Sequence, residues 1–301
     1  MSWKEFSVTV PASTANLGPG FDSIGLALDL HMFVHVSPSA TWQVEYKDQG
    51  YKQLATGTDN LIVATAQAVA DQYNRSLPTA KLVIDTEIPL SRGLGSSASA
   101  IAAGIEIADR LIGLQLSMKE KLKIGTEMEG HPDNISASLL GGLTISYFDE
   151  DELEIIHVPE VEIGVVILVP PTEFLTSESR DLLPGNLPYK TAIRGGASGN
   201  VLAAALVRGD WETAGRMMQK DVFHEPYRKS RFQDFEQIQE SCLKLGVYGM
   251  AISGAGPSLF IAVEKGQEEM VATQLAEKFP LYESLVTKPS SKGIKICETV
   301  L

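Results

Sequence analysis

A loop of small residues, Pro89-Leu-Ser-Arg-Gly-Leu-Gly-Ser-Ser-Ala-Ser99, leads directly into an apolar helix. Such a junction directs free backbone N–H groups at one point, and the helix dipole adds partial positive charge there. Phosphates and other anions bind at such positions. Gly93 and Gly95 permit close approach, while the hydroxyls of Ser96 and Ser97 suit phosphate oxygens or Mg²⁺. The chain therefore carries a candidate phosphate-binding loop.

This loop matches neither of two common nucleotide-binding patterns. The chain holds no Gly-Lys dipeptide, so it lacks a P-loop, and the loop lacks the G-x-G-x-x-G of a Rossmann fingerprint. A plain serine cap after a tight glycine turn is the alternative. Two further glycine-rich segments, Asn16-Leu-Gly-Pro-Gly-Phe-Asp22 and Ser253-Gly-Ala-Gly-Pro-Ser258, follow predicted strands. Three such loops favour one shared phosphate pocket.

Local patterns predict an α+β fold. Helices are expected over 96–111 and from Ser117, which forms a capping box with Glu120. Segments 247–252 and 259–263 read as hairpin strands. Helices and strands mix in both halves of the chain without strict βα alternation.

Chain length predicts two domains. The 301 residues allow about two domains of ordinary size. We place the boundary in the stretch 149–162, which is acidic and is expected to be irregular. The predicted domains are residues 1–160 and 161–301.

Charge and composition narrow the class of protein. With 25 Lys and Arg against 38 Asp and Glu, the net charge is -13, so nonspecific nucleic acid and anionic membrane surfaces would be repelled. Cys242 and Cys297 are expected to be reduced thiols. No apolar run approaches the ~18 residues of a membrane helix. We expect a cytoplasmic protein without nucleic-acid or membrane partners.

These motifs together resemble a known family. P-x-x-x-G-L-G-S-S-A, read at Pro89 to Ala98, is similar to the ATP loop of the GHMP kinases. Pro11 to Asp22 resembles the substrate loop of the homoserine kinase branch, as do His131-Pro-Asp-Asn134 and Ile252 to Ser258. The resemblance implies an N-terminal domain like domain 2 of ribosomal protein S5 and a ferredoxin-like C-terminal domain. The active site would lie between them.

The resemblance also implies an activity and cofactors. The chain would use ATP and Mg²⁺ to phosphorylate the L-homoserine hydroxyl, giving O-phospho-L-homoserine for threonine biosynthesis. ATP would contact Asn60, near adenine, and the loop residues Pro89, Leu90, Ser91, Arg92, Gly93, Leu94, Gly95, Ser96, Ser97, Ala98 and Ser99. For Asn60, a helix-cap role is an equal alternative. Mg²⁺ would bind Ser97 and Glu127, with Glu129 as the other candidate.

Homoserine is a zwitterion, so its carboxylate requires arginine and its ammonium requires oxygen acceptors. By resemblance, Arg180 and Arg228 bind the carboxylate, with Arg231 as the alternative to Arg228. The other residues implied at the substrate are Asn16 and Asp22 for the ammonium, His131, Asn134 and Gly254 lining it, and Thr176 beside the transferred phosphate. The catalytic set is then Asn134, Thr176, Ser97 and Glu127. We expect no dedicated base, because positioning and electrostatic stabilisation suffice for a loose transition state.

The sequence leaves two alternative functions open. Another GHMP kinase, acting on mevalonate for instance, has a substrate without an ammonium and would leave Asp22 without a partner. A noncatalytic nucleotide-binding protein of this fold would carry a damaged loop, whereas Ser96 and Ser97 are both present. Dimers are usual in the family, so the resemblance also implies a homodimer.

Overall fold

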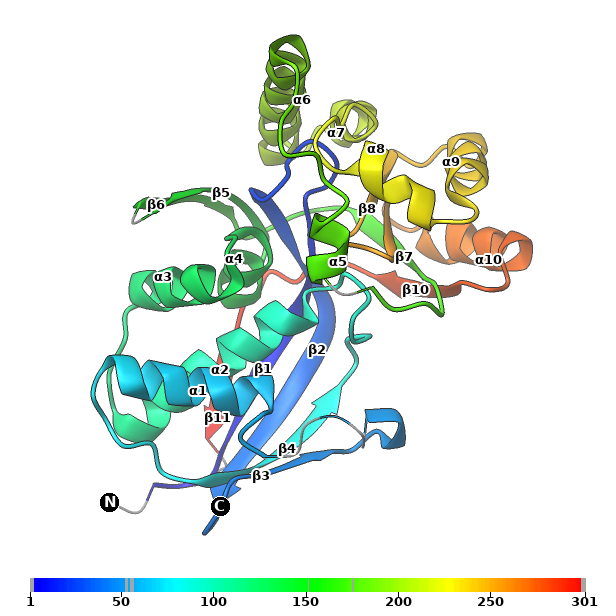
Figure 1. The fold of residues 1–301 in the computed structure, drawn as a ribbon. Coiled ribbons are helices and arrows are strands. Elements are labelled where there is room, and N and C mark those ends of the chain that lie inside the picture. Colours follow the sequence, from blue (N-terminus) through cyan, green and yellow to red (C-terminus); the bar gives the residue numbers. More distant parts are fainter. Residues whose placement is uncertain (1–2, 52–53, 55–56, 151, 175, 299–301) are drawn as a thin grey trace.

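The fold is built on two sheets that follow one another along the chain (Figure 1). The computed structural model describes residues 3–51, 54, 57–150, 152–174 and 176–298. In the first sheet the order is β11-β1-β2-β4-β3, and β5 joins β2 to β6. Its strands are β1 (Phe6–Ala15), β2 (Ile24–Pro38), β3 (Gln43–Tyr46), β4 (Ala80–Thr86), β5 (Leu143–Asp149), β6 (Glu152–Val158) and β11 (Lys295–Glu298).

The second sheet is antiparallel, with the order β10-β7-β9-β8. Its strands are β7 (Gly164–Val169), β8 (Gly249–Ile252), β9 (Leu259–Val263) and β10 (Glu283–Thr287). The predicted hairpin is confirmed, because β8 and β9 pair directly across the loop 253–258. The mixture of strands and helices in both halves confirms the α+β prediction.

Helices of the first half pack beside one another on one side of the first sheet (Figure 1). They are α1 (Leu61–Gln72), α2 (Ser96–Ile112), α3 (Met118–Glu129) and α4 (Asp133–Leu140), and a short 3-10 helix covers Gln49–Tyr51. Asn60 caps α1 by accepting from the N–H of Ile62, and Ser117 and Glu120 form the predicted capping box on α3. The helical side chains and the inward face of the sheet form a common apolar core.

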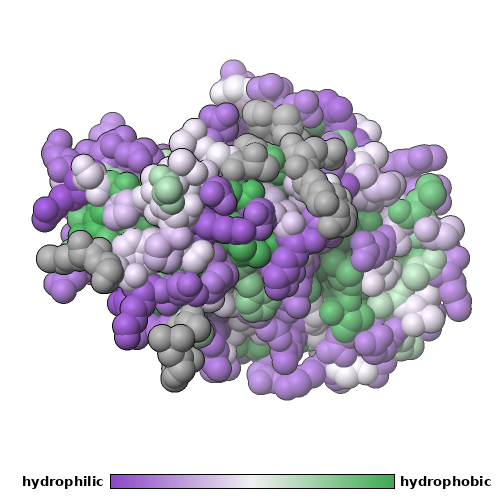
Figure 2. Space-filling view, turned by 90° about the horizontal axis from the view of Figure 1, so that it is seen from below, coloured by the Kyte–Doolittle hydropathy of each residue, from purple (hydrophilic) through white to green (hydrophobic). Residues whose placement is uncertain are grey.

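Helices of the second half surround the second sheet and extend from it (Figure 1). They are α5 (Thr176–Arg180), α6 (Tyr189–Val207), α7 (Trp211–Met218), α8 (Glu225–Arg228), α9 (Phe235–Lys244) and α10 (Glu268–Lys278), with a 3-10 turn at Lys229–Arg231. None of the helices in the described chain has the length and apolar character needed to span a bilayer. On the face shown in Figure 2, hydrophilic side chains predominate and hydrophobic ones gather in smaller patches.

One expectation about the middle of the chain is wrong. The stretch 149–162 was expected to be irregular, but β6 lies within it and pairs with β5 along its length. Leu153 and Ile155 alternate with exposed glutamates, so β6 is a half-buried edge strand, and the exposed apolar Ile156 interrupts its period of two. The last strand, β11, pairs with β1, so the chain returns to the first sheet. The division at residue 160 stays a prediction.

Hydrogen bonds join the two halves at the ends of their strands. The hydroxyl of Ser253 donates to the carbonyl of Gly93 at 2.6 Å, and the N–H of Ser258 donates to the carbonyl of Arg92 at 3.2 Å. The Arg92 guanidinium reaches back to the carbonyls of Pro170 and Pro171 at 3.1 and 2.9 Å. The second half of the chain therefore contacts the glycine-rich loop both at its backbone carbonyls and at the Arg92 side chain.

A substitution at Gly25 on β2 tests how closely the first sheet packs against α4. A Cβ at Gly25 would overlap the carbonyl of Asp133 at the start of α4. We predict that Gly25→Ala lowers the free energy of unfolding by about 1–3 kcal/mol, because the backbone must shift to make room. Urea unfolding measures this loss.

Gly185→Ala is the matched control for this substitution. No atom lies within 4 Å of a Cβ built at Gly185. Its free energy of unfolding should stay within about 0.5 kcal/mol of the unsubstituted protein. Equal losses in the two variants would contradict the close packing of β2 against α4.

Candidate active site

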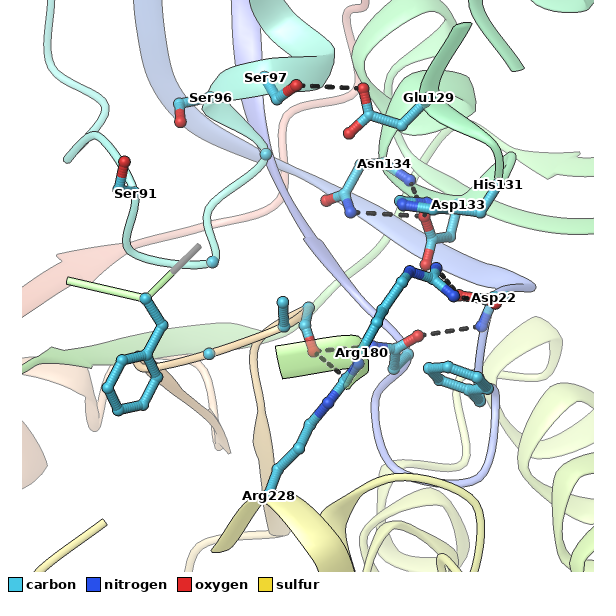
Figure 3. Close-up of a pocket in the computed structure, with 18 residues that line it drawn as sticks. Asp22, Ser91, Ser96, Ser97, Glu129, His131, Asp133, Asn134, Arg180 and Arg228 are labelled. Atoms are coloured by element: carbon cyan, nitrogen blue, oxygen red, sulfur yellow. Dashed lines mark hydrogen bonds and ion pairs between the residues drawn. The ribbon is translucent and has the colours of Figure 1, made fainter. Parts of the chain in front are cut away.

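Three loops from distant parts of the chain converge on one pocket (Figure 3). They are the loop after β1, the loop before α2 and the loop between β8 and β9. The pocket is lined by Asn16, Phe21, Asp22, Ser91, Gly93, Gly95, Ser96, Ser97, Glu129, His131, Asp133, Asn134, Phe174, Arg180, Arg228, Gly254, Ala255 and Gly256. The three glycine-rich segments thus share a pocket, as their sequences predict.

The start of α2 forms one end of this pocket. Gly95 precedes the helix in the left-handed conformation, with φ of 68°, and no side chain of the described residues caps it. The first N–H groups of α2 are therefore available to an anion, and the helix dipole favours one. Ser96 and Ser97 line the pocket at this point. Gly93, with φ of 74°, leaves no room for a Cβ beside the carbonyl of Ser253.

The remaining residues of the loop 89–99 are either buried or line a different pocket. Leu94, Ala98 and Ser99 are fully buried, and the Ser99 hydroxyl donates to the Pro11 carbonyl at 3.1 Å. Pro89, Leu90 and Arg92 line a neighbouring pocket that also includes Tyr51. Asn60 lies outside both linings and donates to the Tyr46 hydroxyl at 3.1 Å in addition to capping α1.

The structure places the two glutamates at the end of α3 in different surroundings. Glu127 is exposed, forms an ion pair with Lys123 at 3.7 Å and does not line the pocket. Glu129 lines the pocket and accepts a hydrogen bond from the Ser97 hydroxyl at 3.3 Å (Figure 3). Burial raises the pKa of the Glu129 carboxyl, and the nearby charge of His131 opposes that rise. The structure therefore brings Glu129, the other candidate, next to Ser97, whereas Glu127 lies outside the pocket lining.

Asp22 and Arg180 form a two-armed ion pair at the end of the pocket away from Ser96 and Ser97 (Figure 3). The two guanidinium nitrogens donate to the two carboxylate oxygens at 3.1 and 2.7 Å. Although burial lowers the pKa of Arg180, its contact with Asp22 outweighs this and the net shift is upward. The side chains are about one-third exposed, at 33% and 36%, so a ligand can reach both charges.

Arg228 supplies a second guanidinium beside Arg180 (Figure 3). It is 3% exposed, and burial together with the charge of Arg180 lowers its pKa to about 10. It donates to the Gly254 carbonyl at 3.1 Å, which also accepts from the Asn16 amide at 2.8 Å. Arg231, the alternative to Arg228, instead packs against the Phe174 ring and lines neighbouring pockets.

His131, Asp133 and Asn134 form a connected cluster at the start of α4. The Nδ1–H of His131 donates to the Asp133 carboxylate at 2.6 Å, and the N–H of Asn134 donates to the same oxygen at 2.6 Å. The Asn134 amide oxygen accepts from the Ser13 hydroxyl at 3.0 Å. Burial lowers the pKa of His131, but its contact with Asp133 and nearby acids give a net rise. Asp133 had no predicted role, although it lies inside the His-Pro-Asp-Asn motif.

The structure therefore brings most of the predicted residues to one pocket. Asn16, Asp22, His131, Asn134, Arg180, Arg228 and Gly254 line it together with Ser91, Gly93, Gly95, Ser96 and Ser97. Thr176 begins α5, and its side chain lies outside the described part of the structure. Phe21 also lines the pocket, beneath both guanidinium groups, and no local sequence signal singled it out. One end thus suits an anion, and the other offers fixed charges of both signs.

Comparisons with known proteins agree with this arrangement. Residues 60–142 match the GHMP kinases N terminal domain, and residues 202–281 match GHMP kinases C terminal. A homoserine kinase of Bacillus velezensis is 46% identical over 96% of this chain and 94% of its own length. A proposed homoserine kinase of Listeria monocytogenes superposes with a TM-score of 0.84 at 31% identity, covering 97% of this chain and 99% of that one. A homoserine kinase structure from Cytophaga hutchinsonii shares the fold, with a TM-score of 0.85 at 24% identity, 99% of this chain and 98% of that one.

The contact between His131 and Asp133 gives a pH-dependent prediction. Asp133→Asn should lower the pKa of His131, because the neutral amide stabilises the imidazolium less. The raised folded pKa means that this contact stabilises the fold below the unfolded value of about 6.5. That contribution is lost as pH rises through the folded pKa, so Asp133→Asn should reduce stability more at acid than at alkaline pH. NMR titration and urea unfolding measure the two effects.

Asp149→Asn, at the exposed end of β5, is the control for loss of one acidic charge. It should leave the His131 titration unchanged. An identical His131 titration in the Asp133→Asn protein would contradict the ion pair.

Proposed function

Since the chain belongs to the homoserine kinases of the GHMP kinase family, we propose that it transfers the γ-phosphoryl group of ATP to the L-homoserine hydroxyl. The products are ADP and O-phospho-L-homoserine, an intermediate for threonine biosynthesis. One observation carries this proposal: an uncapped helix start and a set of paired charges lie at the two ends of a single pocket. We also propose a cytoplasmic homodimer, on the family pattern alone.

The ATP phosphates would bind at the start of α2. The N–H groups that follow Gly95 have no side-chain cap in the described chain, and the Ser96 hydroxyl lies beside them. Because Gly93 and Gly95 carry no Cβ, phosphate oxygens can approach the backbone closely. These donors are fixed before ATP arrives, so they stabilise charge on the transferred group without reorganising.

Mg²⁺ would bind Ser97 and Glu129. A hydroxyl and a carboxylate are hard oxygen donors, and Mg²⁺ usually takes only one or two protein ligands beside phosphate and water. The 3.3 Å contact between these side chains supports a shared ion. When bound, Mg²⁺ neutralises charge on the phosphates. Glu127 points away from this position and pairs with Lys123.

The amino acid would bind at the opposite end of the pocket. Arg180 and Arg228 match its carboxylate, and Asp22 and the Asn16 amide oxygen match its ammonium. The Asp22–Arg180 ion pair supports this assignment, because it places a carboxylate and a guanidinium group side by side, and a zwitterion needs one partner of each charge. Thr176 stays a predicted neighbour of the transferred phosphate.

We propose that positioning, rather than a dedicated base, drives the transfer. Asp22 is engaged by Arg180, and Asp133 accepts from both His131 and the N–H of Asn134. A loose transition state for phosphoryl transfer requires little early loss of the hydroxyl proton. His131 and Asn134 would then orient the hydroxyl in line with the γ-phosphoryl group.

ADP release over a panel of alcohols tests the proposed function. L-Homoserine should be turned over with the highest kcat/KM, and the product should be O-phospho-L-homoserine by phosphorus NMR. 4-Hydroxybutanoate lacks the ammonium and 3-aminopropan-1-ol lacks the carboxylate, so each should react more slowly because one charged contact is lost. Faster turnover of mevalonate, or ADP release from none of these alcohols, would overturn the proposal.

Two matched variants on α3 test the metal assignment. Glu129→Gln should raise the Mg²⁺ concentration for half-maximal activity by at least about tenfold, since even groups that only orient metal ligands cost that much. Glu127→Gln removes an equal charge from the same helix and should leave the Mg²⁺ dependence unchanged. A titration of activity against Mg²⁺ at saturating ATP measures both. The reverse pattern would return the assignment to Glu127.

A further inference from the structure

His224 lies behind the amino-acid end of the pocket, at the residue before α8. Its side chain is completely buried, and its ring is stacked on Phe21 with centroids 5.2 Å apart. Phe21 lines the pocket, and the guanidinium groups of Arg180 and Arg228 lie 5.6 and 5.4 Å from its ring centroid. His224 does not itself line the pocket, but it contacts Phe21 and Arg228, which do.

The hydrogen bonds of His224 define a single tautomer. Its Nδ1 lies 3.2 Å from a terminal nitrogen of Arg228, and its Nε2 lies 3.0 Å from the Gly18 carbonyl oxygen. A guanidinium only donates, so Nδ1 must accept. The ring proton is therefore on Nε2 and is donated to the Gly18 carbonyl.

The same contacts join two parts of the site that are distant in sequence. Gly18 belongs to the loop after β1 that carries Asp22, and Arg228 ends α8 in the other half of the chain. Among the residues that the structure describes, the other acceptors of Arg228 are the backbone carbonyls of Ser179 and Gly254. His224 is therefore the side chain that fixes where a terminal nitrogen of this guanidinium points.

We propose that His224 is a positioning residue for recognition of the amino-acid carboxylate: as a neutral acceptor it holds Arg228 toward the pocket, and as a donor it ties Arg228 to the Gly18 loop. This inference rests on the proposed function and names the group that controls one of its substrate contacts. It requires the ring to be uncharged, because an imidazolium would place two cations in contact.

The surroundings of His224 favour the uncharged ring. Burial lowers the pKa of His224 to about 4, against the opposing charge of Asp221. The Asp221 carboxylate accepts instead from the backbone N–H groups of Phe223, His224 and Glu225 at 2.8, 3.0 and 2.7 Å. It lies farther from the ring, at 3.5 Å from Nε2. Asp221 thus shapes the turn into α8, and the ring is left to bridge Gly18 and Arg228.

Steady-state kinetics of His224 variants test this proposal. His224→Leu removes both hydrogen bonds, and the KM for L-homoserine should rise about tenfold or more, as expected for a lost bond to a charged group. The KM for ATP should change less than twofold, because the start of α2 is untouched. His224→Asn retains an acceptor near the position of Nδ1 and should recover most of the homoserine affinity.

Substrates that lack the carboxylate provide a second readout. The preference for L-homoserine over 3-aminopropan-1-ol, measured as a ratio of kcat/KM, should fall at least about tenfold in His224→Leu and be largely restored in His224→Asn. A purely structural role would lower both kcat/KM values together and leave their ratio intact. Should His224→Leu fail to fold, His224→Asn and His224→Gln give the comparison, since Gln keeps the donor to Gly18 but misplaces the acceptor.

Glu225→Gln is the matched control on α8. Glu225 is buried beside His224, accepts from the N–H of Ile252 at 2.6 Å and has its pKa raised to about 8 by burial. The amide keeps the shape and the acceptor, so both KM values should stay within about twofold. An unchanged homoserine KM in His224→Leu, or parallel changes in the homoserine and ATP KM values, would overturn the role of His224. If the unsubstituted protein does not phosphorylate L-homoserine, the proposed function is overturned instead.

Discussion

The pocket is organised around the start of α2, whose first backbone N–H groups have no side-chain cap among the described residues. Gly95 leaves the helix uncapped within the described chain, and Gly93 lets the loop between β8 and β9 pack directly against it. Unsatisfied donors are costly when buried, so the groups must face a pocket that admits water or an anion. The hydrogen bonds of Ser253 to Gly93 and of Arg92 to Pro170 attach this loop to the second half of the chain.

The opposite end of the pocket is governed by the cost of burying charge. Arg228 is almost completely buried, and Arg180 lies close enough to lower its pKa. Two guanidinium groups can share this space because Asp22 pairs with Arg180, while Arg228 is held by carbonyl oxygens and the neutral His224 ring. Acceptors of this kind satisfy the guanidinium protons without cancelling the positive charge that a carboxylate ligand would meet.

Much of the fold and the site follows from local sequence signals. The capping box at Ser117, the helix after Gly95 and the hairpin around residues 253–258 all depend on neighbours within a few positions, so the sequence predicts them. By contrast, β6 was missed because the exposed Ile156 interrupts its alternation of apolar and polar residues. Asp133 was given no role although its contact with His131 spans only two positions, because the sequence does not show that both side chains are buried at the pocket.

By itself the sequence determined which chemical groups are available: backbone donors with glycine beside them, serine hydroxyls, the carboxylates of Glu127 and Glu129, and the guanidinium groups of Arg180, Arg228 and Arg231. Only the tertiary structure decided which of these meet. Glu127 and Glu129 are separated by about 200° around their helix, so the packing of α3 against its neighbours turns one toward Ser97 and the other toward Lys123. Arg228 and Arg231, on either side of the first residues of a 3-10 turn, also have different surroundings: Arg228 lines the pocket, whereas Arg231 packs against Phe174, because a side chain's direction depends on the whole fold around it.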